Sequence, residues 1–116
     1  PLPLNLLRAA KTGTALHFSE HDFRGVSYVR EVIDKLIPAM ELPGGVYNFG
    51  SGNDCDMFET VSRFARLLGV EVPLEKDHWE RNLVMSGEKL KDFGIQFDST
   101  IQAFQQCLDD YGFGHF

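Results

Sequence analysis

The sequence predicts an α/β fold of about four helices with short strands between them. Apolar residues recur at helical spacing in several segments, short apolar runs separate these segments, and glycine or proline marks the junctions. The 116 residues are 43% hydrophobic and include ten Phe, which is enough to build the core of one domain. We therefore expect residues 1–116 to form a single folded region.

The first segments are predicted to be a helix followed by extended chain. Helical spacing covers residues 4–11, and Gly13 stops it. A strand is expected at residues 14–18, and an extended segment at 26–28. The polar residues between them, 19–25, read as a turn.

The second helix is predicted from one apolar stripe and should end near Pro38, because proline disrupts a helix interior. The stripe consists of Val29, Val32, Ile33, Leu36, Ile37 and Met40. A turn follows at residues 43–45. The apolar run at 46–49 then predicts a short strand that is covered on both faces.

The third helix has the clearest boundaries. Asp56 and Glu59 stand at capping-box spacing, and Gly69 lies where a helix-ending glycine belongs. Its expected buried face consists of Met57, Phe58, Val61, Phe64, Ala65 and Leu68. A strand at residues 70–73 and an irregular charged stretch at 75–81 should follow.

Two further helices are predicted near the end of the chain. Ser86 is expected to cap a short helix that ends at Gly94. Ser99 and Gln102 again have capping-box spacing and predict a last helix that stops at Gly112. Its expected buried residues are Ile101, Phe104, Leu108 and Tyr111. The tail at 113–116 is expected to be ragged.

Charge and composition exclude several classes of protein. Lys and Arg number 11 against 17 Asp and Glu, and the net charge of −6 opposes binding to nucleic acid. The apolar runs are too short to cross a membrane, and the first residues lack the basic region of a signal peptide. Cys55 and Cys107 are too few for a disulfide scaffold. We expect a cytoplasmic protein with neither a nucleic-acid nor a membrane partner, and the start at Pro1 indicates a piece of a longer chain.

The glycines at 50 and 52 resemble a dinucleotide-binding turn, with Glu71 at a suitable distance, but the residues that follow oppose this function. Cys55 replaces the third glycine, and Asp54 and Asp56 would repel a phosphate at the start of the helix. The sequence therefore predicts an aspartate-capped turn and no cofactor site in this chain.

The histidines and Cys55 are interpreted as structural residues and not as metal ligands or catalytic groups. His17 and His21, with Asp22 adjacent, would share a face only on a helix, whereas the pattern here is a strand and a loop. Cys55 stands between two aspartates and has no neighbouring His in the sequence to act as its base, so it is not expected to act as a nucleophile. Neither a metal site nor a catalytic residue is predicted.

Three residues in irregular segments are the candidates for ligand binding. Arg24 and Arg81 lie at predicted loop or strand margins, where a guanidinium group can form two hydrogen bonds to a phosphate. Trp79 is the single tryptophan and could stack on a base or sugar. The alternatives are solvated surface arginines and a tryptophan that anchors the charged stretch to the core.

The order of several segments resembles the C-terminal part of the dTDP-4-dehydrorhamnose reductases, which belong to the extended short-chain dehydrogenase/reductase superfamily. The segments are FRGVSYVREVI at 23–33, GVYNFGS at 45–51, the helix at 58–69, NLVMSGEKL at 82–90 and CLDDY at 107–111. The resemblance covers nearly the whole chain. It implies the small substrate-binding region of an extended short-chain dehydrogenase/reductase.

In that family an N-terminal Rossmann domain carries the cofactor turn and a Tyr-x-x-x-Lys catalytic pair. Neither occurs here, since the residues four places after Tyr28, Tyr47 and Tyr111 are valine, serine and histidine. The resemblance implies a nucleotide-sugar substrate, NAD(P)H bound by the missing domain, and an isolated chain that is inactive. Where that domain would pack, an exposed apolar surface is expected, which self-association could cover.

The resemblance also bears on the candidate residues. It places Glu31 at the position where the family usually has an aspartate, in the segment before the interface helix. It places Arg24 where the related epimerases keep an arginine that contacts phosphate. The reductases have an Arg-Pro pair where this chain has Trp79 and Glu80, so Arg81 is displaced from that position. Two other functions remain open, a non-catalytic regulatory or binding module of the same fold and a free-standing acidic α/β interaction domain.

Overall fold

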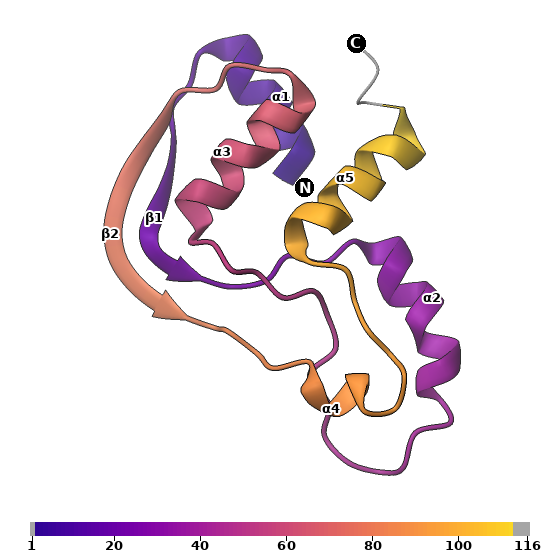
Figure 1. Cartoon of the computed structure of the whole chain (residues 1–116). Helices are drawn as coiled ribbons and strands as arrows, with labels where there is room; N and C mark the ends of the chain where they lie inside the picture. The colour runs from indigo at the N-terminus through magenta and orange to yellow at the C-terminus, as the bar shows by residue number, and fades with distance from the viewer. Residues whose placement is uncertain (1, 113–116) are drawn as a thin grey trace.

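The structure is a computed structural model that describes residues 2–112, so the tail expected to be ragged lies outside the described residues. The mixed α/β class is confirmed. The elements in chain order are α1 (Leu2–Thr12), β1 (Leu16–Phe23), α2 (Val29–Ala39), α3 (Met57–Leu68), β2 (Leu74–Asn82), α4 (Glu88–Lys91) and α5 (Thr100–Tyr111). Figure 1 shows the paired strands along one side of α3, with α2 and α4 at the opposite end of the molecule.

The two strands form a parallel sheet, and neither has the boundaries that the sequence predicts. β1 continues through the expected polar turn to Phe23, and β2 occupies the charged stretch at 75–81 that was expected to be irregular. The strands expected at 46–49 and 70–73 are absent from the described residues. The two real strands are stabilised by pairing with each other, which local composition does not reveal.

The pairing contains one irregularity, which we call the bulge. Ser19 pairs with Asp77 and His21 pairs with Glu80, so β2 has one more residue than β1 between these pairs. His78 and Trp79 therefore lie opposite the single residue Glu20. A bulge redirects the side chains on its strand, which is relevant to both sites described below.

The helix caps follow the sequence closely. The Asp56 carboxylate accepts a hydrogen bond from the Glu59 amide at 2.8 Å, and Gly69 ends α3 with φ of 73°. Ser99 and Gln102 form a complete capping box at the start of α5. The predicted boundaries of α3 and α5 are confirmed, because these signals act within a few residues.

The core lies where α1, α3 and α5 meet beside the sheet. Its buried residues are Leu6, Met57, Val61, Phe64, Leu68, Phe104 and Leu108. The rings of Phe64 and Phe104 stack with centroids 3.8 Å apart. Tyr111, which the sequence predicts to be buried, is 61% exposed because it is the last residue of α5 and extends past this core.

The molecule is thin and leaves much apolar surface exposed. Its radius of gyration is 15.6 Å, and its smallest dimension is 17 Å. A compact domain of this length would have a radius of gyration of about 13 Å. No residue of α2 is buried, and Ile37 and Met40 on the predicted stripe are 74% and 81% exposed, so the expected exposed apolar surface is confirmed.

No helix within residues 2–112 has the length and apolar character needed to cross a membrane.

Candidate functional site

The candidate site is built around a buried carboxylate at the end of β1. Asp22 is 1% exposed, and its partner in the strand register is Arg81 on β2. Arg81 donates hydrogen bonds from Nε to Oδ1 and from Nη2 to Oδ2 of Asp22, both at 2.9 Å. This two-pronged geometry fixes the plane of the Arg81 guanidinium group, and the bonds to Asp22 raise its pKa above the ordinary range.

Arg24 approaches the same carboxylate from the loop after β1. Its Nε lies 3.6 Å from Oδ2 of Asp22, close enough for an ion pair but too long for a hydrogen bond. That nitrogen is buried and has no hydrogen-bond partner among the described residues. The backbone is held in place, since Asn53 donates from its side chain to the Arg24 carbonyl at 3.1 Å. The loop therefore holds Arg24 beside Asp22.

Trp79 lies beside Arg81 and adds an aromatic side chain to the site around Asp22. The Arg81 guanidinium carbon lies 4.9 Å from the centre of the Trp79 ring, within the range of a cation–π contact. The Ser19 hydroxyl donates to the Trp79 carbonyl, which ties the bulge to β1. Trp79 is 45% exposed, so part of its ring remains free for a ligand. The structure thus brings together Arg24, Trp79 and Arg81, the three residues that the sequence selected.

We call Asp22, Arg24, Trp79 and Arg81 the arginine cluster. Two guanidinium groups share one carboxylate, so the cluster carries a net positive charge in an acidic protein. Partly exposed arginines beside an aromatic face suit a ligand with a phosphate and a planar ring. Sequence reasoning missed the role of Asp22, because the pairing that brings Arg81 to it spans 59 residues of chain.

Close packing of the backbone holds the loop that carries Arg24. A Cβ added to Gly25 would overlap the carbonyl oxygen of Ser51, so only glycine fits at this position. The Ser51 amide also donates to the Ser27 hydroxyl at 2.8 Å. The segment around glycines 50 and 52, which resembles a cofactor turn in sequence, therefore packs against the loop after β1.

The other residues considered from the sequence lie apart from the arginine cluster. Glu31 accepts a hydrogen bond from the Asp98 amide at 2.9 Å and joins α2 to the loop before α5. His17 lies 3.6 Å from carboxylate oxygens of Glu75 and Asp77 on β2. His21 Nε2 lies 3.6 Å from a carboxylate oxygen of Glu20. Within residues 2–112 the ligand atoms of His17, His21 and Asp22 do not converge into one group.

The two cysteines are free and partly buried. The Cys55 amide donates to the Asn53 side chain, which belongs to the turn before α3. Burial raises the pKa of the Cys107 thiol, which keeps it protonated and weakly nucleophilic.

Comparison with solved structures identifies the fold. The chain superimposes on dTDP-4-dehydrorhamnose reductase from Bacillus anthracis, determined in complex with NADP, with a TM-score of 0.77 and 15% identity, covering 94% of this chain and 42% of that chain. The chain has the fold of part of this reductase. The resemblance inferred from segment order is confirmed at the level of the fold. No family model matches the sequence, and no curated protein matches it.

Two further structures share the reductase fold. RMD from Pseudomonas aeruginosa, complexed with NADPH, gives a TM-score of 0.64 at 20% identity over 95% of this chain and 41% of that chain. The Bordetella bronchiseptica enzyme WbmG, in complex with NAD and UDP, gives 0.65 at 19% identity over 100% of this chain and 40% of that chain. The chain therefore spans about two fifths of the length of each solved enzyme.

Proposed function

We propose that residues 1–116 are the substrate-binding region of an NAD(P)H-dependent reductase that acts on a 4-keto nucleotide sugar such as dTDP-4-dehydrorhamnose. The support is the shared fold with a reductase of that name, over a segment matching about two fifths of its length. Another enzyme of this fold was determined with UDP bound. The segment order in the sequence resembles that of the reductases, whereas Arg24 stands where the related epimerases keep an arginine and the reductases tend to have glycine.

The observation that carries the proposal is the convergence of Arg24, Trp79 and Arg81 around Asp22. Arg24, whose side chain is 38% exposed, would bind a phosphate of the nucleotide diphosphate through the exposed part of its guanidinium group. Trp79 would stack on the base or sugar, and Asp22 would hold Arg81 in a plane from which it contacts the same diphosphate. These residues bind and orient, which contributes to catalysis by holding the sugar in reactive geometry.

The chemical step belongs to a part of the parent protein outside this chain. NAD(P)H would supply the hydride, and the Rossmann domain would hold it and provide the proton donor. A groove of ≈ 630 Å³ lies between α1 and α5, and its lining is mostly apolar, including Leu4, Val29 and Tyr111. Such a lining would not suit a charged nucleotide. We assign this groove and the stripe on α2 to contact with the Rossmann domain, or to self-association when that domain is absent.

Titration of the chain with dTDP, followed by isothermal calorimetry, tests the proposal. Arg24→Ala should weaken binding by about 1 to 3 kcal/mol, because it removes a charge-assisted contact to phosphate. Arg63→Ala is the matched control, since Arg63 is similarly exposed but pairs with Glu59 on α3 away from the cluster. Absence of dTDP binding, or equal affinity in the two variants, would refute the assignment of Arg24.

A further inference from the structure

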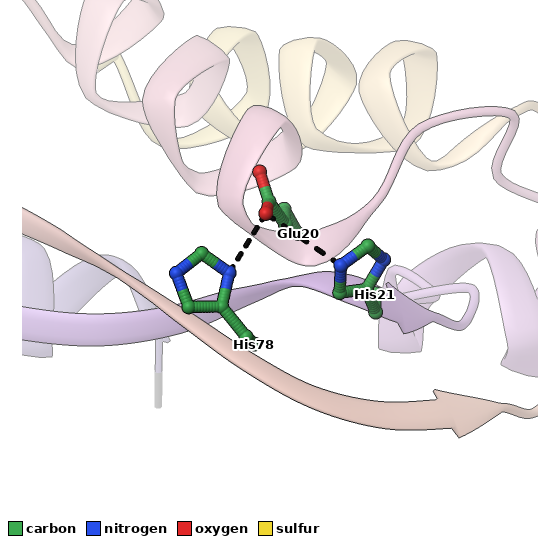
Figure 2. A group of neighbouring side chains, drawn as sticks. All are labelled: Glu20, His21 and His78. Carbon is green, nitrogen blue, oxygen red and sulfur yellow. Dashed lines mark hydrogen bonds and ion pairs between the residues drawn. The ribbon is translucent and has the colours of Figure 1, made fainter.

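A second group of side chains lies at the bulge, beside the arginine cluster but separate from it. Glu20 and His21 come from β1 and His78 comes from β2, and Figure 2 shows the carboxylate of Glu20 facing both imidazoles. Oε1 of Glu20 lies 2.7 Å from Nδ1 of His78 and 3.6 Å from Nε2 of His21. Within residues 2–112 no other set of three His, Cys, Asp or Glu residues brings its ligand atoms within 4.8 Å of one another.

We propose that Glu20, His21 and His78 form a binding site for a divalent transition-metal ion of the zinc class. Two imidazole nitrogens and one carboxylate oxygen are a ligand set that proteins use for zinc with one position left open. The site does not depend on the proposed nucleotide-sugar function, because it shares no residue with the arginine cluster.

The three ligand atoms lie within 4.8 Å of one another, and the two distances from Glu20 fit this chemistry after a small adjustment. Zinc bonds of about 2.0 to 2.1 Å place tetrahedral ligand atoms roughly 3.3 Å apart. The Glu20–His21 distance of 3.6 Å is already near this value. The Glu20–His78 distance of 2.7 Å is a direct hydrogen bond and must lengthen by roughly half an ångström, which side chains as exposed as these can accommodate.

Strand pairing holds the three residues in position. Glu20 and His78 are 58 residues apart, and the extra residue in β2 at the bulge places His78 opposite Glu20. The Lys76 ammonium lies 3.4 Å from the other carboxylate oxygen, Oε2, and leaves Oε1 for the metal.

The ion would join β1 to β2 and thereby stabilise the folded chain. A ligand that binds only the folded state stabilises it by an amount that grows with the logarithm of the free ligand concentration relative to the dissociation constant. Free Zn²⁺ at about 100 times its dissociation constant should raise the midpoint of thermal unfolding by about 5 °C or more. The readout requires neither a nucleotide sugar nor any part of the parent protein.

The test is a calorimetric titration of the metal-free chain with Zn²⁺ in a non-chelating buffer. We expect one strong site per chain, with affinity at least roughly tenfold lower in both His78→Gln and His21→Gln. His17→Gln is the matched control, because His17 is an imidazole on β1 with a side-chain exposure of 53% against 50% for His21. Far-UV circular dichroism verifies that each variant is folded.

Each result of the zinc titration either supports or overturns the proposed site. Selective loss in the two cluster variants, together with the zinc-dependent rise in midpoint, supports the site. Failure of the wild type to bind Zn²⁺ overturns it, as does an affinity in folded His78→Gln that matches His17→Gln. Because dTDP binding is measured separately, a negative zinc result leaves the nucleotide-sugar proposal unaffected, and the reverse also holds.

Discussion

Replacement of Asp22 by alanine tests whether the buried carboxylate organises the arginine cluster. The substitution removes two charge-assisted hydrogen bonds, both at 2.9 Å, from a residue that is 1% exposed. Such bonds contribute about 1.5 to 3 kcal/mol each. Because the Arg81 side chain is 39% exposed and can turn to water, we take the lower end for each bond and expect a loss of about 3 kcal/mol.

Urea unfolding followed by far-UV circular dichroism measures this loss. Asp22→Asn keeps the shape and one acceptor, so it should cost less than Asp22→Ala. Glu59→Ala provides the comparison, since Glu59 forms an exposed pair with Arg63 within one helix and should cost about 0.5 kcal/mol or less. If Asp22→Ala were no more destabilising than Glu59→Ala, the carboxylate would not organise the cluster and our account of Arg81 would be wrong.

Two further predictions concern the loop after β1 and the contact between its far end and α5. Gly25→Ala should destabilise the chain by about 1 to 3 kcal/mol in urea unfolding, because the added methyl group overlaps the Ser51 carbonyl oxygen. Gly52→Ala is its control, because a methyl group added at Gly52 meets open space. Equal losses of stability in the two variants would contradict the close approach of Gly25 to Ser51. Burial and the 2.8 Å hydrogen bond to Asp110 raise the pKa of Tyr28 to about 12 from 10.0. The folded state therefore retains the phenolic proton more tightly, so the associated stability is complete below pH 10.0 and is lost as pH rises toward about 12. Tyr28→Phe should flatten the fall in unfolding free energy over that range, and an unchanged slope would show that the contact does not contribute.

The sequence predicted the parts of the fold that short-range interactions determine. The cap at Asp56 and the capping box at Ser99 act within one helical turn, and both were identified correctly. β2 was missed because residues such as Glu75 and Lys76 have low strand propensity and little burial. Its stability comes from pairing with β1, a long-range interaction that the sequence pattern does not reveal.

The candidate site also divides into features that the local sequence indicates and features that depend on long-range strand pairing. Arg24, Trp79 and Arg81 were selected because arginine and tryptophan at loop margins suit phosphate and ring recognition. Their convergence on Asp22 depends on the parallel register that pairs this residue with Arg81. The group at Glu20 and His78 was missed for the same reason, since nothing local indicates that a bulge brings these residues together.

The exposure of α2 has a consequence for the timescale of its motions. A helix of 11 residues without a buried side chain lacks the buried apolar contacts that hold most protein helices together. A helix this short is marginal in water by itself. We expect its amides to exchange with solvent much faster than those of α3, whose apolar face is buried. A surface that covered α2 would therefore select one state from a helix–coil equilibrium, and part of the binding free energy would be used to order the helix.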